Sequence, residues 1–372
     1  MFNEHQPKSE EYRIEDTPVD LCTHVVYIGA VVDSEYLELT PQDKKVDIQE
    51  KGFQKFADLK KRRSDVKLLL GVNIWSDEVF QQIIATNNTR KNFIDSAIRL
   101  LKRYNFDGLA YNWYYPKEVI HNYATLNEET KQAFKSAGHD SWTVSVFVDG
   151  TEEFIGVGLD HKRICQTADF VHLRVWRHPG YTKNFTDVPS PMNRRTFDKG
   201  ELEHYNVVDA TRNWINIGCP REKILLKVWL NGLIFNLVDT TKRVVNSPSH
   251  SFPDFVPYNK ICSRLQQDDE YWTEDWDARS MSPYAISYPT WIGYENEVSL
   301  EEKVHFVDSE GLGGLVVDSP DSDDYSGICG KKYPLLTALF EAYKPIWSTD
   351  DDTFGFAIER SRRDVGPKGK KI

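Results

Sequence analysis

The feature of this sequence that most constrains its fold is a series of short, almost continuously apolar runs rich in β-branched residues. Runs of this kind are typical of parallel strands buried on both faces of their sheet. Seven of them are predicted to be strands, at residues 21–30, 66–75, 106–113, 143–148, 170–176, 223–230 and 313–319. Apolar residues at helical spacing accompany them at residues 89–104, 201–217, 301–309 and 335–343. This alternation indicates the α/β class with a parallel sheet.

The number of strands is one short of a closed (β/α)₈ barrel. The length of 372 residues fits such a barrel with insertions, because barrels of about 250 residues grow past 400 in this way. The missing strand would have to precede residue 21, where the chain is polar and contains Pro7 and Pro18. We therefore expect a barrel whose first strand is missing.

One segment interrupts the alternation. Residues 239–294 are rich in Pro, Ser, aromatic and acidic residues, which predicts a small subdomain inserted between the last two units of the barrel. The barrel itself is predicted to occupy residues 1–238 and 295–347. The tail, residues 348–372, is first acidic and then basic without apolar periodicity, and we expect it to be disordered.

Composition excludes several classes of function. With 46 Lys and Arg against 57 Asp and Glu, the net charge is −11, and a nucleic-acid-binding body would need clustered basic residues. No apolar stretch approaches the about 20 residues of a membrane-spanning helix, so we expect neither nucleic acid nor membrane as a partner. The first residues lack the pattern of a secretory signal, which taken alone indicates the cytosol.

Metal binding is not indicated either. The ten histidines show none of the spacings of zinc sites, so we expect neither a metal nor a cofactor. Four carboxylates in the loop after the last strand could hold Ca²⁺ or form a solvated turn, and we favour the turn. They are Asp318, Asp321, Asp323 and Asp324.

Residues 106–116 read Phe-Asp-Gly-Leu-Ala-Tyr-Asn-Trp-Tyr-Tyr-Pro. They resemble the signature strand of the glycoside hydrolase family 18 chitinases, Asp-Gly-x-Asp-x-Asp-Trp-Glu-Tyr-Pro. Residues 21–27, 66–75 and 311–336 are similar to the second, third and last strands of that family, the last with its trailing loop. The resemblance implies a (β/α)₈ TIM barrel with an inserted small α+β subdomain, in agreement with the order of elements.

The same resemblance predicts that this chain is catalytically inactive. In active members the Glu is the general acid, two Asp residues tune it, and the substrate's own N-acetyl group is the nucleophile. The three matched positions hold Ala110, Asn112 and Tyr114. Tyrosine has a pKa near 10, far above the working pH of a general acid, and neither alanine nor asparagine carries a charge.

Sugar-binding positions of the family have changed as well. Arg177 stands where the family has the Asp that holds the N-acetyl group, Asn231 where it has a Tyr, and Asp318 where a Trp forms the floor of the central sugar subsite. Trp75 and Tyr115 match retained aromatic positions. Trp75 either contacts sugar, as the resemblance implies, or fills space in the barrel mouth, and both readings stay open.

These changes favour a non-catalytic chitinase-like protein that acts as a secreted binding or signalling factor. One alternative is a lectin that binds chitin or N-acetylglucosamine oligomers without hydrolysis. Another is a residual hydrolase in which Glu118, Asp318 or Asp321 serves as the acid. The ligand is therefore a chitin-type oligosaccharide or a protein receptor, and the oligomeric state stays open.

Five cysteines leave one without an intramolecular partner. The resemblance implies a disulfide between Cys262 and Cys329. Cys165 and Cys219 each precede a strand, and a bridge between them is possible, but we favour two separate thiols. The resemblance also implies that Cys22 pairs with a cysteine in the family's first strand, which follows a signal peptide.

An N-terminally incomplete sequence would explain the missing strand, the odd cysteine and the absent signal together. On that interpretation the protein is secreted. Asn87 and Asn184, each in an Asn-x-Thr acceptor sequence, are then candidate N-glycosylation sites.

Overall fold

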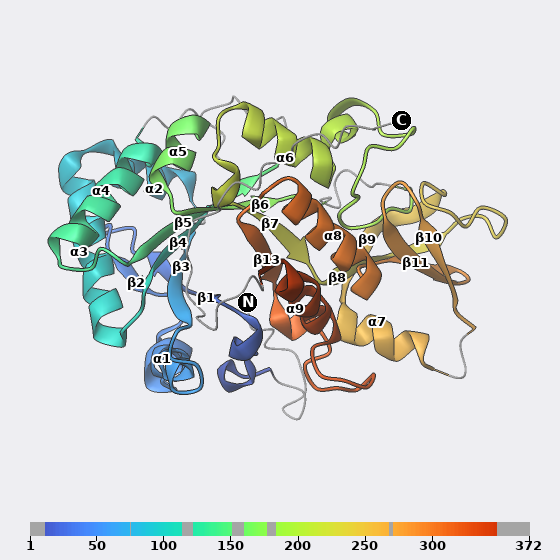
Figure 1. The fold of residues 1–372 in the computed structure, drawn as a ribbon, viewed down its shortest axis with the longest axis horizontal. Helices are drawn as coiled ribbons and strands as arrows, with labels where there is room; N and C mark the ends of the chain where they lie inside the picture. Colours follow the sequence, from blue (N-terminus) through green and yellow to red (C-terminus); the bar gives the residue numbers. More distant parts are fainter. Residues whose placement is uncertain are drawn as a thin grey trace, which may run out of the picture.

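The structure is a computed structural model, which describes residues 12–74, 76–113, 122–150, 160–176, 184–267 and 271–347. Parallel strands alternate with helices along most of the chain (Figure 1). The parallel strands are β1 (His24–Val32), β3 (Lys67–Ile74), β4 (Gly108–Trp113), β5 (Thr143–Asp149), β6 (Phe170–Arg174), β7 (Ile224–Trp229) and β13 (Gly314–Asp318). Each lies within or beside a predicted strand, so all seven predictions are confirmed.

The strands are arranged in the order β1-β3-β4-β5-β6-β7-β13, and every neighbouring pair is parallel. A short strand, β2 (Leu39–Pro41), pairs antiparallel with the end of β1. In the described part of the chain, β1 and β13 are not paired with each other. The described sheet therefore contains seven parallel strands of a TIM-barrel-like α/β fold.

The start of β4 shows why the chain must carry glycine in its signature strand. Gly108 has φ of +152°, and a Cβ at this position would lie 2.0 Å from the backbone oxygen of Thr143 on β5. The preceding residue, Asp107, accepts a hydrogen bond from the backbone N–H of Leu68 at 2.8 Å and pairs with Lys60. These contacts fix the register of β4 between its two neighbours.

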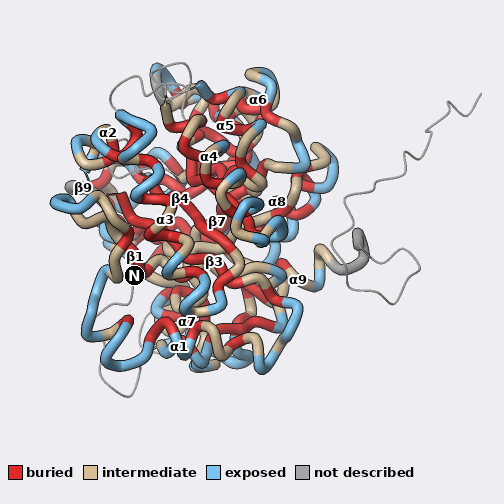
Figure 2. The backbone as a smooth tube through the Cα atoms, turned by 90° about the vertical axis from the view of Figure 1, so that its left-hand side faces the viewer, coloured by how far each residue is buried: buried red, intermediate tan, exposed pale blue. Residues whose placement is uncertain are grey.

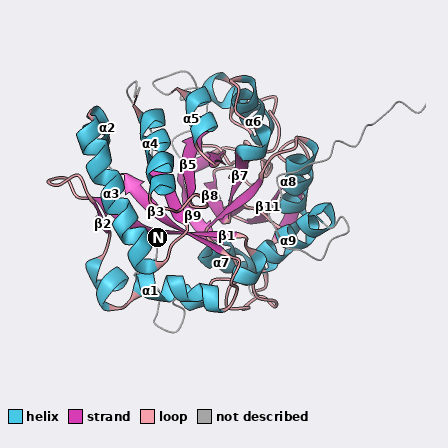
Figure 3. Ribbon diagram, turned by 60° about the vertical axis from the view of Figure 1, so that its left-hand side comes forward, coloured by secondary structure: helices cyan, strands magenta, loops and turns pink. Residues whose placement is uncertain are grey.

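Helices cover the outside of the parallel strands (Figure 3). They are α1 (Gly52–Ala57), α2 (Asp77–Ala85), α3 (Asn87–Tyr104), α4 (Tyr123–Ser136), α5 (His161–Thr167), α6 (Val207–Asn216), α8 (Glu297–Ser309) and α9 (Pro334–Trp347). The helix predicted at residues 201–217 is divided into a 3₁₀ turn at Gly200–His204 and α6. It restarts because the Asn206 side chain accepts a hydrogen bond from the backbone N–H of Asp209 and caps α6.

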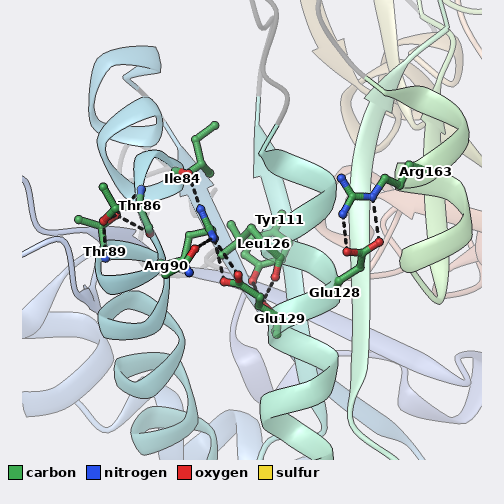
Figure 4. A network of polar contacts seen from close by, with 11 residues as sticks. Ile84, Thr86, Thr89, Arg90, Tyr111, Leu126, Glu128, Glu129 and Arg163 are labelled. Carbon is green, nitrogen blue, oxygen red and sulfur yellow. Dashed lines mark hydrogen bonds and ion pairs between the residues drawn. The ribbon is translucent and has the colours of Figure 1, made fainter.

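Polar contacts fasten three of these helices to one another (Figure 4). Thr86 and Thr89 cap the start of α3, which is why this helix begins before the predicted residue 89. Arg90 on α3 is buried and binds Glu129 on α4 at 2.7 Å, while Arg163 on α5 binds Glu128 at 2.5 Å. The two neighbouring acids of α4 thus hold a helix on either side.

A second sheet is inserted after β7. Its five antiparallel strands, in the order β10-β11-β12-β8-β9, are β8 (Asn231–Leu237), β9 (Ser249–Pro257), β10 (Thr273–Asp277), β11 (Ser282–Ser287) and β12 (Thr290–Gly293), with helix α7 (Tyr258–Leu265) between β9 and β10. Because β8 pairs with β9 and β12, the sheet begins before residue 239. We propose 231–293 as the range of the inserted subdomain.

Buried residues concentrate along the strands and on the inner faces of the helices (Figure 2). One large cluster fills the space between the parallel sheet and its helices, and a separate one, around Trp291 and Phe235, forms the core of the insertion. Within the described ranges, no helix is both long and apolar enough to cross a bilayer. The predicted tail at 348–372 lies outside the described residues.

Candidate functional site at the barrel mouth

In barrels of this type, functional side chains gather where the parallel strands end, at the barrel mouth. Alternation along β4 directs Ala110 and Asn112 inward, and both are buried. The Asn112 amide donates to Asn73 on β3 at 2.8 Å, and the Asn73 amide donates in turn to Gln42 at 2.8 Å. Neutral amides therefore occupy the part of the mouth where family resemblance places carboxylates.

An ion pair lies on the opposite side of the mouth. Lys227 on β7 approaches Asp318 on β13 to 2.8 Å, and the lysine is almost fully buried. Its ammonium group also lies 4.8 Å from the ring centres of Phe147 and Trp176, which is within cation–π range. The position expected to hold a floor tryptophan is thus a carboxylate already bound to a lysine.

This pairing determines the protonation of Asp318. Burial raises the pKa of its carboxyl group, but the charge and the hydrogen bond of Lys227, with a further contribution from Arg174, hold the pKa below its usual value. Asp318 is therefore ionised at neutral pH. An ionised carboxylate has no proton to donate to a leaving group.

Aromatic side chains lead from the mouth onto the insertion. The Trp176 and Trp229 rings lie 5.2 Å apart, and Trp229 packs edge-on against Phe255 of β9 at 4.9 Å. Phe255 is half exposed, and the two tryptophans are partly buried. We call these three residues the aromatic arc.

Deeper in the barrel, polar atoms lack partners among the described residues. They are Oδ1 of Asn112, Oγ of Ser145 and Nδ1 of His172, which belong to the consecutive strands β4, β5 and β6. Burial lowers the pKa of His172 to about 3, and the charge of Lys227 adds to this effect, so His172 is neutral. These three side chains therefore place uncharged polar atoms in the interior below the mouth, and none of them carries a negative charge.

Some of the other predicted site residues lie away from the barrel mouth or outside the described residues. Asn231 begins β8, at the edge of the insertion, where its Oδ1 lies 3.5 Å from Oγ of Ser322. Four further predicted positions, together with the alternative acid Glu118, lie outside the described residues: Trp75, Tyr114, Tyr115 and Arg177.

The acidic loop after β13 differs from our expectation of a solvated turn. Asp323 and Asp324 are both fully buried. Asp323 accepts the backbone N–H of Leu336 at 2.9 Å, and Asp324 accepts those of Cys329 and two of its neighbours. The prediction is wrong for these two residues, because the loop folds inward and backbone N–H groups of the loop and of the start of α9 donate to their carboxylates.

The structure contains two disulfides. Cys262 and Cys329 are joined, as the resemblance implied. Cys165 and Cys219 are also joined, with their Cα atoms 5.2 Å apart, so the expectation of two separate thiols is wrong. Their segments meet because they lead into the adjacent strands β6 and β7. Burial raises the pKa of the remaining thiol, Cys22, to about 11.

The two candidate glycosylation sites are both exposed. Asn87 lies in the first turn of α3, and its Oδ1 accepts a hydrogen bond from Arg90. Asn184 lies beside the insertion in the left-handed backbone region, with φ of +63°.

Sequence reasoning missed Lys227, Trp229 and Phe255. A signal was present for the first of these, because Lys227 interrupts the otherwise apolar strand β7. A charged residue inside a buried strand needs a partner, which is a reason to search for a polar site. Phe255 offered no such signal, since its place beside Trp229 depends on how the insertion packs.

Comparisons with known proteins agree with this architecture. The model of the glycosyl hydrolases of family 18 matches residues 4–323. An endochitinase of Manduca sexta is 29% identical over 358 residues, which are 90% of this chain and 64% of the relative. The chain therefore spans less than two thirds of that enzyme's length.

Solved structures show the same fold. The Group IV chitinase of Ostrinia furnacalis superposes with a TM-score of 0.83 at 27% identity, covering 91% of this chain and 96% of that one. YKL-39, solved in the presence of chitooligosaccharides, gives a TM-score of 0.80 at 25% identity and covers 91% and 96%. Human YKL-39 is a pseudo-chitinase that retains chitooligosaccharide binding.

Proposed function

The chain belongs to the glycosyl hydrolases of family 18, and from this premise we propose that it is a non-catalytic member that binds a chitin-type oligosaccharide without cleaving it. The observation that carries the proposal is the replacement of charged and aromatic groups at the mouth. Ala110 and Asn112 match two positions of the family's carboxylate triad, and both are buried. Asp318 matches the position of the floor tryptophan, and its carboxylate is paired with Lys227.

Loss of hydrolysis follows from the protonation of the groups that remain. Removing a general acid lowers a rate by about 10² to 10⁴. Asp318, one of the acids considered as a replacement, is ionised at neutral pH because Lys227 holds its pKa low. Neither Ala110 nor Asn112 carries the charge that would stabilise a cationic intermediate.

Binding is supported by the aromatic arc. The apolar faces of N-acetylglucosamine rings pack on aromatic side chains, and tryptophan offers the largest such surface. The arc continues from Trp176 at the mouth to the half-exposed Phe255 on the insertion. An oligosaccharide lying along it would avoid the central position that the Lys227–Asp318 pair occupies.

Extracellular action is part of the proposal. Two disulfides favour folding in an oxidising compartment, since cytosolic thiols are kept reduced. The absence of hydrolysis is compatible with a signalling role, in which a protein receptor replaces or accompanies the glycan.

The test of catalysis is turnover of a fluorogenic N-acetylglucosamine oligomer by the purified chain. We expect a rate at least about 10² below that of a family member with an intact triad. Turnover comparable to the active enzyme, abolished by Asp318→Asn, would overturn the non-catalytic assignment.

The test of binding is titration with an N-acetylglucosamine tetramer, with retention on chitin beads as a second measurement. Trp229→Ala is expected to weaken binding about tenfold, which corresponds to about 1.4 kcal/mol. Tyr36→Ala is the matched control, because Tyr36 is an exposed aromatic residue whose backbone oxygen binds Asn92 on α3, away from the arc.

The outcomes separate the alternatives. No binding by the unaltered chain would contradict the glycan proposal and leave the protein receptor as the explanation. Binding that Trp229→Ala leaves unchanged would remove the arc from the proposal. Trp75→Ala in the same assay tests the sugar contact predicted for that residue.

A further inference from the structure

An exposed apolar surface lies at one end of the inserted sheet. Phe185 forms a β-bridge with Pro248, and the backbone N–H of Val238 donates to the Pro248 oxygen at 3.1 Å. The backbone N–H of the neighbouring Leu237 donates to the oxygen of Pro289 at 2.8 Å, which brings the turn containing Tyr288 to the same end of the sheet. We call Phe185, Val238, Pro248 and Tyr288 the apolar row.

The side chains of this row are turned away from the core of the insertion. Val238 directly follows β8 and is exposed, whereas Leu237, the last residue of β8, is buried together with Trp291. Phe185 is 46% exposed, and Val238 and Tyr288 are each 49% exposed. Three large apolar side chains at one end of the sheet form a surface that promotes association between protein molecules unless it is covered.

The residue before Phe185, Asn184, begins an acceptor sequence for N-linked sugar. Asn184 is exposed, and its backbone oxygen accepts the N–H of Ser249 at 2.8 Å, which fixes it beside Pro248. Thr186 completes the acceptor sequence, but its hydroxyl is buried, donates to the Val244 oxygen and accepts the N–H of Ser247. Recognition of that hydroxyl must therefore occur before the chain folds.

We propose that Asn184 carries an N-linked glycan whose first N-acetylglucosamine covers the apolar row. The sugar's apolar face would pack on the ring of Phe185, the residue next to the attachment point. In the transfer, the Asn184 amide nitrogen bonds to the anomeric carbon of a lipid-diphosphate-linked oligosaccharide. The carbon–oxygen bond to the diphosphate breaks, the lipid diphosphate leaves with the electron pair, and the amide nitrogen releases one proton.

Asn87 provides an internal comparison. It is exposed in the same type of acceptor sequence, but its Oδ1 binds the Arg90 guanidinium at the polar start of α3. A glycan on Asn87 would lie over charged helix surface and would cover no apolar row. The shielding role therefore belongs to Asn184 alone of the two sites.

The experiment uses the full chain secreted from insect cells behind a cleavable signal. Intact mass before and after removal of N-glycans, with peptide mapping, reports occupancy at each site. We expect Asn184 to be occupied, and an unmodified Asn184 in the secreted protein would overturn the proposal.

Shielding is tested on the same material. Asn184→Gly removes the acceptor and keeps a residue suited to positive φ. We expect a several-fold rise in binding of an apolar fluorescent dye and self-association in sedimentation. Asn87→Gln is the control and should behave as the unaltered chain, and Val238→Thr added to Asn184→Gly should reverse part of the effect.

A second measurement does not depend on folding of a variant. The glycan is removed enzymatically from the folded protein, either completely or back to the first N-acetylglucosamine. Complete removal should increase dye binding, whereas the single retained sugar should keep it low. Equal dye binding in the glycosylated and fully deglycosylated proteins would show that the glycan does not cover the row.

Discussion

Among the regions that bury charged side chains, two do so in different ways. Where the insertion meets the barrel, the Arg195 guanidinium lies between Asp187 and Asp198, at 2.5 and 3.0 Å, and also donates to Ser280 at 3.1 Å. In the mouth, Lys227 has one carboxylate partner among the described residues, Asp318, which is 30% exposed, and its ammonium group also lies near the rings of Phe147 and Trp176.

The difference teaches that a buried charge does not by itself identify a binding site. The Arg195 cluster is enclosed, and its donors are directed at carboxylates of the protein itself, which makes it a structural link. The mouth leaves the partly exposed aromatic faces of Trp176 and Trp229 beside its ion pair. Only the second arrangement has groups left over for a ligand.

The largest expected effect would come from breaking the enclosed cluster. Arg195→Met removes the Arg195 cation from the buried carboxylates of Asp187 and Asp198, and we expect a loss of about 3–5 kcal/mol in the free energy of unfolding, measured with urea. Arg99→Met is the control, because Arg99 is an exposed partner of Glu38 and should cost less than about 1 kcal/mol. A loss for Arg195→Met no larger than the control's would contradict the structural role.

A smaller loss is expected in the mouth. Lys227→Met removes the partner of Asp318, but that carboxylate is partly exposed and can recruit water. We expect a cost of about 1–3 kcal/mol in the same urea experiment. If Lys227→Met proved more damaging than Arg195→Met, the contrast between an enclosed and an open cluster would be wrong.

The mouth also gives stability a dependence on pH. His172 is neutral in the folded state because burial, and then Lys227, lowers its pKa to about 3, while in the unfolded chain it binds a proton near pH 6.5. Between these values the unfolded state holds more protons, so stability falls as pH falls, by up to about 1.4 kcal/mol per pH unit. His172→Asn should reduce this slope.

The measurement is urea unfolding at several values from pH 6.5 to 4. His24, whose pKa burial lowers to about 4, contributes to the slope in both proteins, so part of it should remain. His305→Asn, on the exposed face of α8, controls for the loss of any histidine. An unchanged slope in His172→Asn would show that the interior histidine takes a proton in the folded state.

The smallest effect on stability is expected at the outer end of the aromatic arc. Phe255 is half exposed, so Phe255→Ala should change the free energy of unfolding by less than about 1 kcal/mol. The same substitution should still weaken oligosaccharide binding in the titration. A variant that loses stability but keeps its affinity would make Phe255 a structural residue.

Much of the fold could be predicted because its signals are local. The apolar runs gave the seven parallel strands, and alternation along β4 placed Ala110 and Asn112 in the interior. The acidic loop shows where local reasoning fails. Nothing near Asp323 in the sequence indicates that its carboxylate will accept N–H groups from the start of α9. Nor does the local sequence indicate that burial will raise the pKa of Asp323 to about 6.

The sequence by itself determined the α/β order of elements and the loss of carboxylates from the signature strand, because the strand pattern and the side chain at each position are properties of a short segment. The tertiary structure alone decided that Lys227 binds Asp318, that Cys165 meets Cys219, and that Trp229 packs on Phe255. These partners are far apart in the chain. Ion pairing, disulfide formation and ring packing depend on distances of a few ångströms, and those distances are set by which strands become neighbours.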